Sequence, residues 1–308
     1  MSDSGSVGAR AYVRTVSIAT IAPDPTADGS EAVPPRRRPA LSPSRAGDFK
    51  QCPLLYRFRA IDRIRTPPSR AQLKGTLVHA ALEALYGLPA GQREPDRASA
   101  LVDESWAAMD DATTAVVTDD DRSAFLSEAR ALVVGYYQLE DPRRFSPQSC
   151  EQHIETEIGD GVVLRGFVDR IDVAANGALR VVDYKTGRAP GEVAESKALF
   201  QMKFYALVLL RTRGIVPAQL RLLYLADGKI LTYAPDRDEL ERFERTLSAM
   251  WKAILVAGAT GDFRPKTSRL CNWCEHKSLC PAFGGTPPEY PGWPESPAED
   301  GAVEDGSI

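Results

Sequence analysis

Residues 166–187 read GFVDRIDVAANGALRVVDYKTG. Apolar and β-branched residues alternate with polar ones on both sides of the Asn-Gly dipeptide at 176–177, which is typical of a tight turn. The stretch therefore predicts a β-hairpin. Because side chains alternate along a strand, Asp183 and Lys185 should share one face of the sheet while Tyr184 points to the other.

The place of Asp169 depends on the register of this hairpin. A two-residue turn would put Asp169 opposite Tyr184, on the wrong face. A three-residue loop at 175–177, with Gly177 in the left-handed conformation, would put it directly opposite Asp183. We predict the three-residue loop, which brings the two carboxylates together.

Two facing carboxylates repel each other, and burying them without a cation is costly. A Mg²⁺ or Mn²⁺ ion would neutralise them, because hard cations prefer oxygen ligands. Lys185 beside that ion would orient water or stabilise charge on a phosphoryl oxygen. The alternative is an ordinary ion pair between Asp183 and Lys185, because the D-x-K pattern often occurs by chance.

Hydrophobic spacing outside the hairpin predicts a mixed α/β domain. Helical patterns lie at about 42–52, 71–86, 96–109, 119–139, 195–213 and 236–256. Further strand patterns lie at 151–158, 219–225 and 229–233. We expect a central mixed sheet flanked by helices over residues 41–284, with residues from about 90 to 145 as a helical insertion.

The composition is that of a globular protein, with 308 residues, of which 43% are hydrophobic and 26% charged. No apolar run approaches the roughly 20 residues that a membrane helix needs, and the N-terminus lacks a signal-peptide pattern. Five cysteines are too few for a secreted disulfide scaffold. We therefore expect a cytoplasmic protein without a membrane partner.

The net charge of −4 is unevenly distributed along the chain. Residues 285–308 contain six acidic residues, five prolines and no Lys or Arg, so the rest of the chain is nearly neutral. Such a segment cannot bury enough apolar surface to fold, and we expect both 1–40 and 285–308 to be disordered. The charge of the body, residues 41–284, therefore does not argue against a nucleic-acid partner.

Four short motifs occur in order: GTLVH at 75–79, GFVDRID at 166–172, VVDYKTG at 181–187 and QMKFYA at 201–206. Together they resemble the RecB-like branch of the PD-(D/E)XK nuclease superfamily, although Val168 stands where the superfamily name has proline. The resemblance implies a restriction-endonuclease-like core and a metal-dependent deoxyribonuclease. By analogy within that branch, it would be an exonuclease that prefers single-stranded DNA or free ends and acts in DNA repair or recombination.

The resemblance also assigns roles to individual residues. It implies His79, Asp169, Asp183 and the Tyr184 carbonyl as metal ligands, and Lys185, Asp183, Asp169, Gln201 and Tyr205 as the catalytic set. Gln201 and Tyr205 are four residues apart and so share one helix face. Glu83 and Glu155 are weaker candidates beside this site.

Four of the five cysteines form a second pattern. Cys271, Cys274 and Cys280 are clustered, and Cys52 lies far upstream, whereas zinc sites usually have two close pairs of ligands. This layout, with proline after Cys52 and after Cys280, resembles AddB-type nuclease domains and the CRISPR-associated iron–sulfur exonucleases. The resemblance implies a [4Fe–4S] cluster that clasps the two ends of the domain, with zinc as the alternative. Cys150 has no place in the pattern.

Nucleic-acid contacts have candidates in the same regions. The basic candidates for phosphate binding are Arg45, Lys50, Arg57, Arg59, Arg264, Lys266, Arg269 and Lys277, and the candidates for base stacking are Phe49, Tyr56 and Trp273. The null hypothesis for the basic set is a solvated surface.

Other functions have less support in the sequence. No G-x-x-x-x-G-K-[ST] motif occurs, so a helicase would be a separate partner protein. The main alternative is a catalytically inactive nuclease fold that binds DNA as a scaffold beside such a helicase. The KTG at 185–187 does not indicate a serine acyl-transfer enzyme, because no S-x-x-K motif accompanies it.

Overall fold

The computed structural model describes residues 39–189 and 192–294. Of the segments predicted to be disordered, 1–40 and 285–308, residues 1–38 and 295–308 lie outside the described residues. The α-helices are α1 (Pro43–Gln51), α2 (Pro53–Tyr56), α3 (Arg70–Gly87), α4 (Pro95–Ala107), α5 (Asp111–Thr114), α6 (Asp119–Gly135), α7 (Glu192–Arg213) and α8 (Arg237–Thr260). The strands are β1 (Ser149–Ile158), β2 (Val162–Val173), β3 (Leu179–Lys185), β4 (Gln219–Tyr224) and β5 (Lys229–Tyr233). A π-helical turn, η1 (Arg57–Ile61), follows α2, and the short turns η5 (Arg269–Trp273), η6 (Lys277–Leu279) and η7 (Pro281–Phe283) follow α8.

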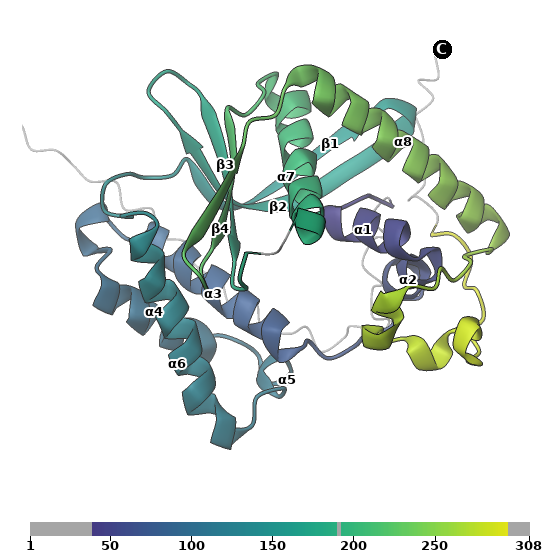
Figure 1. Cartoon of the computed structure of the whole chain (residues 1–308), viewed down its shortest axis with the longest axis horizontal. Helices are drawn as coiled ribbons and strands as arrows, with labels where there is room; N and C mark the ends of the chain where they lie inside the picture. Colours follow the sequence, from purple (N-terminus) through teal and green to yellow (C-terminus); the bar gives the residue numbers. More distant parts are fainter. Residues whose placement is uncertain (1–38, 190–191, 295–308) are drawn as a thin grey trace, which may run out of the picture. The chain divides into compact units, whose positions relative to one another are not determined.

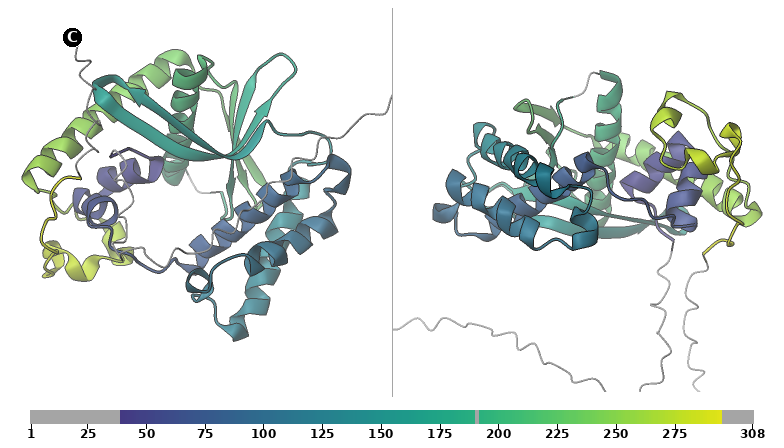
Figure 2. Two further views of the ribbon diagram at one scale, coloured as in Figure 1. Left: turned by 180° about the vertical axis from the view of Figure 1, so that it is seen from behind. Right: turned by 90° about the horizontal axis from the view of Figure 1, so that it is seen from below.

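The five strands form one sheet in the order β1-β2-β3-β4-β5 (Figure 1). All neighbours are antiparallel except β3 and β4, which are parallel and are joined by the crossover helix α7. Alternate strand residues face two different cores: Val181 packs with α7 and α8, and Val182 packs with α3, α4 and α6. Figure 2 shows these two groups of helices from behind and from below. The mixed sheet flanked by helices is therefore confirmed.

The predicted register of the β2–β3 hairpin is also confirmed. The pairs Arg170↔Val182 and Val173↔Leu179 frame a loop at 175–177, and Gly177 has a φ of 80°. Continuing this register by one residue puts Asp169 opposite Asp183. A left-handed residue is required at the end of such a loop, which explains the glycine.

Helix caps in the sequence position the helices around the site. The Ser42 side chain accepts a hydrogen bond from the Arg45 amide and so begins α1. Ser69 and Gln72 form a reciprocal capping box at the start of α3. α3 then runs along the second core and carries His79 in its third turn.

Residues 285–294 differ from the prediction of a disordered acidic segment. The Tyr290 hydroxyl donates to the Gly258 carbonyl (2.7 Å), and the Trp293 ring packs on Trp251 at 6.0 Å between centroids. A Cβ on Gly258 would lie 2.2 Å from the Trp293 ring, so this glycine admits the indole. Tyr290 and Trp293 supply apolar surface that packs against α8, which the average composition of 285–308 did not reveal.

No helix of the described ranges is long and apolar enough to cross a membrane.

Candidate functional site

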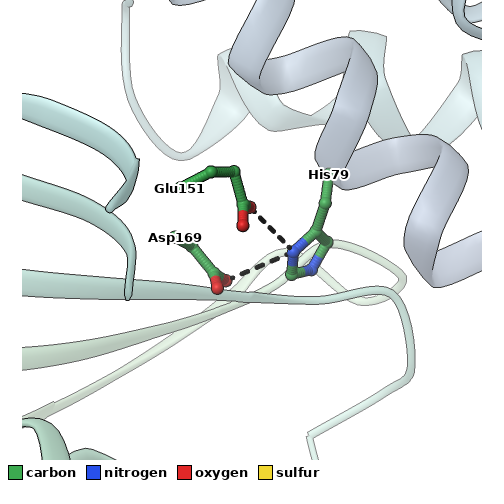
Figure 3. Close-up of side chains that lie close together, drawn as sticks. All are labelled: His79, Glu151 and Asp169. Atoms are coloured by element: carbon green, nitrogen blue, oxygen red, sulfur yellow. Dashed lines mark ion pairs between the residues drawn. The ribbon is translucent and has the colours of Figure 1, made fainter. Parts of the chain in front are cut away.

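Two carboxylates on neighbouring strands, Glu151 on β1 and Asp169 on β2, meet the imidazole of His79 (Figure 3). The Nδ1 atom of His79 lies 3.5 Å from Glu151 Oε1 and 3.5 Å from Asp169 Oδ2. Within the described ranges, these three residues are the only His, Cys, Asp or Glu set whose ligand atoms all lie within 4.8 Å of one another. Asp183 stands opposite Asp169 on the next strand.

Glu151 is the one member of this group that the sequence analysis missed. The β1–β2 ladder is interrupted between Cys150↔Arg170 and Gln152↔Val168, and Glu151 has a φ of 42°. A non-glycine residue with a positive φ breaks the regular alternation of side chains along a strand. The face on which Glu151 lies therefore cannot be predicted by counting every second residue. Counting back along the ladder would have identified it, because the register puts Glu151 opposite Asp169.

Glu155, the candidate proposed on the same strand, lies elsewhere. Its carboxylate is 3.0 Å from Arg165 Nε, and its side chain is well exposed. Glu83 lies near Glu151, and burial, followed by that neighbouring charge, raises the pKa of Glu83.

A second set of contacts surrounds Asp183, which is 1% exposed. Its Oδ1 accepts from Gln201 Nε2 (2.8 Å), and its Oδ2 is 2.6 Å from Lys185 Nζ. Lys185 Nζ also donates to Gln201 Oε1 (3.0 Å), so two groups hold the ammonium in place. Gln201 Nε2 also donates to the Tyr205 hydroxyl oxygen (3.0 Å), as expected for residues on one helix face. The five predicted catalytic residues therefore lie in one region.

The backbone of Tyr184 links the two sets. Its N–H donates to Asp169 Oδ2 (2.8 Å), and its carbonyl lies 2.9 Å from His79 Nε2. A carbonyl oxygen only accepts, so Nε2 carries the proton and Nδ1 faces the carboxylates. The Tyr184 side chain is buried in the core on the opposite side of β3, as predicted.

The groups of this site bind protons more tightly than usual, because burial and repulsion act on the carboxyl group and neighbouring negative charge acts on the two cations. Burial, followed by the charge of Asp183, raises the pKa of Asp169 to about 7. Burial disfavours the imidazolium of His79, but the hydrogen bond to Glu151 and the charges of Asp169 and Asp183 raise its pKa to about 9. For Lys185, burial is likewise outweighed by Asp183, and the pKa is raised. The carboxylates therefore attract positive charge to this position.

The donor set suits a divalent metal ion. Carboxylate and carbonyl oxygens with one imidazole are ligands that Mg²⁺ and Mn²⁺ accept. The buried Asp183 Oδ2 lies beside this set, 2.6 Å from the Lys185 ammonium. His79, Glu151 and Asp169 therefore fit such an ion.

Replacing Glu151 with Gln tests its inclusion in this set. The substitution keeps the shape of the side chain and removes one negative charge beside His79. We expect the affinity for Mn²⁺ to fall by about 10-fold to 100-fold, measured by calorimetric titration. The matched control is Glu155→Gln, four residues along the same strand, which should leave the affinity unchanged. Equal affinities for both variants and the wild type would exclude Glu151.

The site opens into a cleft of about 1440 Å³. Its basic lining residues are Arg45, Lys50, Arg59, Arg165, Lys185, Arg188 and Lys266. Only Asp48, Asp169 and Asp183 among the cleft-lining residues are acidic, so the cleft is basic although the chain carries a net charge of −4. A basic cleft around an acidic centre suits a phosphate-backbone ligand.

Several candidates for nucleic-acid contact belong to the core instead. Arg57 is buried, pairs with Asp62 at 3.1 Å and stacks over Tyr290. Tyr56 is buried between Phe49 and Phe263, with ring centroids 5.6 Å and 6.2 Å away. Trp273 is 75% exposed but does not line this cleft.

The four patterned cysteines line one small cavity of about 30 Å³. Figures 1 and 2 both show α1 and α2, which flank Cys52, beside the segment that carries Cys271, Cys274 and Cys280. Cys52 Sγ accepts from the Lys266 amide, and Cys271 Sγ from the Ser268 amide, both at 3.3 Å.

The four patterned cysteines and Cys150 lie in different surroundings. Burial raises the pKa of Cys274, and the three neighbouring thiols raise it further. Cys150 packs in the other core, where burial raises its pKa to about 11. The structure thus brings together the four cysteines that the sequence pattern grouped and keeps Cys150 apart.

Comparison with known proteins gives a family match and two relatives. A family model described as the PD-(D/E)XK nuclease superfamily matches residues 40–281. Gene 69 protein of Mycobacterium phage D29 is 25% identical over 286 residues, covering 80% of this chain and 97% of that protein. Gene 69 protein of Mycobacterium phage L5 is 30% identical over 127 residues, covering 40% and 41%. A solved structure titled "Crystal structure of SSO0001" aligns over 68% of this chain and 84% of that chain, with 18% identity and a TM-score of 0.35.

Proposed function

We propose a metal-dependent deoxyribonuclease activity for this chain, which belongs to the PD-(D/E)XK nuclease superfamily. The observation that carries the proposal is the convergence of His79, Glu151, Asp169 and Asp183 beside Lys185 in a basic cleft. A superfamily of nucleases implies DNA as the substrate. Within that class, we propose an exonuclease of the RecB-like branch that acts on single strands or free ends in repair or recombination, with any helicase as a separate partner.

The reaction is hydrolysis of a phosphodiester. When bound, the divalent ion would polarise the scissile phosphate and lower the pKa of a water molecule. In the hydrolysis, a water oxygen bonds to phosphorus, the bond from phosphorus to the leaving oxygen breaks, and the leaving oxygen takes up, overall, the proton that the water gives up. Asp183 and Gln201 hold the Lys185 ammonium where it stabilises negative charge on the phosphoryl oxygens.

The surrounding residues prepare the cleft for this substrate. Lys50 and Lys266 line the cleft with exposed side chains and would bind backbone phosphates. Gly166 admits the Tyr205 ring, because a Cβ there would lie 2.9 Å from Tyr205 Cε1. Tyr205 in turn contacts Gln201, so this glycine supports the group that orients Lys185.

We also propose that Cys52, Cys271, Cys274 and Cys280 hold a [4Fe–4S] cluster. Backbone amides that donate to two of the sulfurs are of the kind that tune such clusters. Tetrahedral zinc with bonds of about 2.3 Å would bring the sulfurs to about 3.8 Å from one another. Zinc is the alternative at this position.

Replacing Cys274 with Ser tests the cluster. We expect loss of bound iron and of visible absorbance, and a lower melting temperature. A clasp that closes a loop of about 220 residues restricts the unfolded chain by on the order of 5 kcal/mol. The control is Cys150→Ser, which should keep the iron. A colourless wild type, purified without oxygen and free of iron, would overturn the proposal, and bound zinc would replace it.

Digestion of end-labelled DNA tests the function. Full-length protein purified without oxygen is incubated with single-stranded and double-stranded substrates, with Mn²⁺, with Mg²⁺ or with EDTA. We expect metal-dependent degradation, faster on single strands, with label released from an end. DNA binding without cleavage under any divalent metal would instead support the inactive scaffold.

A further inference from the structure

Arg170 is a buried cation next to the proposed metal site. It follows Asp169 in β2, its side chain is fully buried, and it pairs with Glu140 at 2.7 Å and with Asp172 at 3.0 Å. Replacing such a buried ion pair as a whole by apolar residues often leaves the stability of a protein unchanged or raises it. Stability alone therefore does not account for a guanidinium at this position.

One nitrogen of Arg170 contacts three elements of the fold. Its Nη1 donates to the hydroxyl oxygens of Tyr86 (3.1 Å), Tyr136 (2.9 Å) and Tyr184 (2.8 Å), and all three side chains are buried. Tyr86 belongs to α3, Tyr136 to the turn η3 (Tyr136–Gln138), and Tyr184 to β3. Two of these elements, α3 and β3, also hold residues of the proposed metal site, whereas the three residues of η3 do not belong to it.

The same two elements meet again at the metal site. His79 lies on α3 seven residues before Tyr86, which is about two helical turns along one face. On β3, the backbone N–H of Tyr184 donates to Asp169 Oδ2 (2.8 Å), and its carbonyl accepts from His79 Nε2 (2.9 Å). Arg170 thus joins α3 to β3 through two tyrosine hydroxyls, and the backbone of one of these tyrosines contacts both His79 and Asp169.

We propose that Arg170 is a positioning residue of the metal site, which holds α3 against β3 so that His79 and Asp169 are in place before the metal binds. The inference rests on the proposed nuclease function and adds a residue that acts on its metal site from the core. Arg170 is fully buried and does not line the cleft, so it acts through Tyr86 and Tyr184. Partners that orient metal ligands in this way typically raise the affinity for the metal by 10-fold to 100-fold.

Three variants that each lose one hydroxyl separate positioning from stability. Tyr86→Phe, Tyr136→Phe and Tyr184→Phe each remove one contact of Arg170 Nη1 and keep the ring and the guanidinium. Tyr136→Phe is the matched control, because its element holds no residue of the metal site. The Tyr136 hydroxyl also donates to Glu140 (3.1 Å), so its removal should cost at least as much stability as the other two changes.

The affinity for Mn²⁺ is measured by calorimetric titration of each full-length protein, and the free energy of unfolding without metal by denaturant. We expect Tyr86→Phe and Tyr184→Phe to bind Mn²⁺ about tenfold more weakly than the wild type. Tyr136→Phe should bind like the wild type although it is destabilised. A purely structural role of Arg170 predicts instead that the three variants have the same affinity.

Two results would overturn the inference. They are wild-type affinity for Mn²⁺ in either Tyr86→Phe or Tyr184→Phe, and an equal loss of affinity in all three variants. The unfolding curves show whether each variant is folded, and if Tyr86→Phe or Tyr184→Phe is not, the other variant decides the question. Failure of the wild type to bind Mn²⁺ would instead refute the metal site of the proposed function.

Discussion

The variant Asp183→Asn should lose cleavage activity by about 10³-fold or more while remaining folded. Asp183 contacts Lys185 and Gln201, and it faces Asp169 across the hairpin. The amide cannot replace a carboxylate toward a divalent ion or toward the ammonium. The measurement is the rate of Mn²⁺-dependent degradation of end-labelled single-stranded DNA.

Stability should change little, and this separates loss of chemistry from loss of fold. Asp183 raises the pKa of Asp169, which means that the two carboxylates repel each other without a metal. Removing one charge relieves that repulsion but also removes the charge partner of Lys185, so the two effects oppose each other and the metal-free variant should melt near the wild-type temperature. The control is Asp160→Asn, which removes a surface carboxylate paired with Lys252 and should keep full activity. Cleavage at the wild-type rate by Asp183→Asn would refute the assigned centre.

The variant Arg170→Leu should be the most destabilised of the substitutions considered, by about 3–5 kcal/mol. Arg170 is fully buried and contacts Glu140 at 2.7 Å and Asp172 at 3.0 Å. It also donates to the hydroxyls of Tyr86, Tyr136 and Tyr184 at 2.8–3.1 Å. Without the guanidinium, two carboxylates remain buried near each other. Denaturant unfolding measures the loss.

A surface ion-pair variant provides the comparison. Arg143 pairs with Glu94 at 2.9 Å and with Asp141 at 2.8 Å, but these groups are exposed, so Arg143→Leu should cost less than about 1 kcal/mol. Equal, small losses of stability for Arg170→Leu and Arg143→Leu would show that the buried contacts of Arg170 stabilise the fold no more than a surface ion pair does.

Acidic pH should reduce the difference in the free energy of unfolding between the wild type and Arg170→Leu. Burial alone would raise the pKa of Glu140, but Arg170 holds that pKa below its usual value of 4.5. A lowered carboxyl pKa gives stability that is present at neutral pH and lost as the pH falls below the usual value. The free energies of unfolding of wild type and variant should therefore converge in acid.

The sequence predicted those features that depend on local chemistry. Gly177 sets the loop that aligns Asp169 with Asp183, and the spacing of four residues puts Gln201 and Tyr205 on one helix face. The predicted strands and long helices match the observed ones within a few residues.

What the sequence did not predict depends on long-range packing. Glu151 enters the site only because β1 and β2 break their alternation together, and Glu155 was named in its place. In the sequence, Arg170 is an ordinary basic strand residue. Only the fold brings it into contact with tyrosines from α3, from the turn after α6 and from β3. The aromatic residues Tyr290 and Trp293 likewise find their partners on α8.

The carboxylates of three adjacent strands, with His79, are proposed to hold a divalent metal ion. Calorimetric titration of Mn²⁺ into the full-length protein and into Asp169→Asn tests this metal site. We predict saturable binding by the wild type that is lost or weakened by more than about tenfold in the variant. Identical binding curves for the two proteins would contradict the claim.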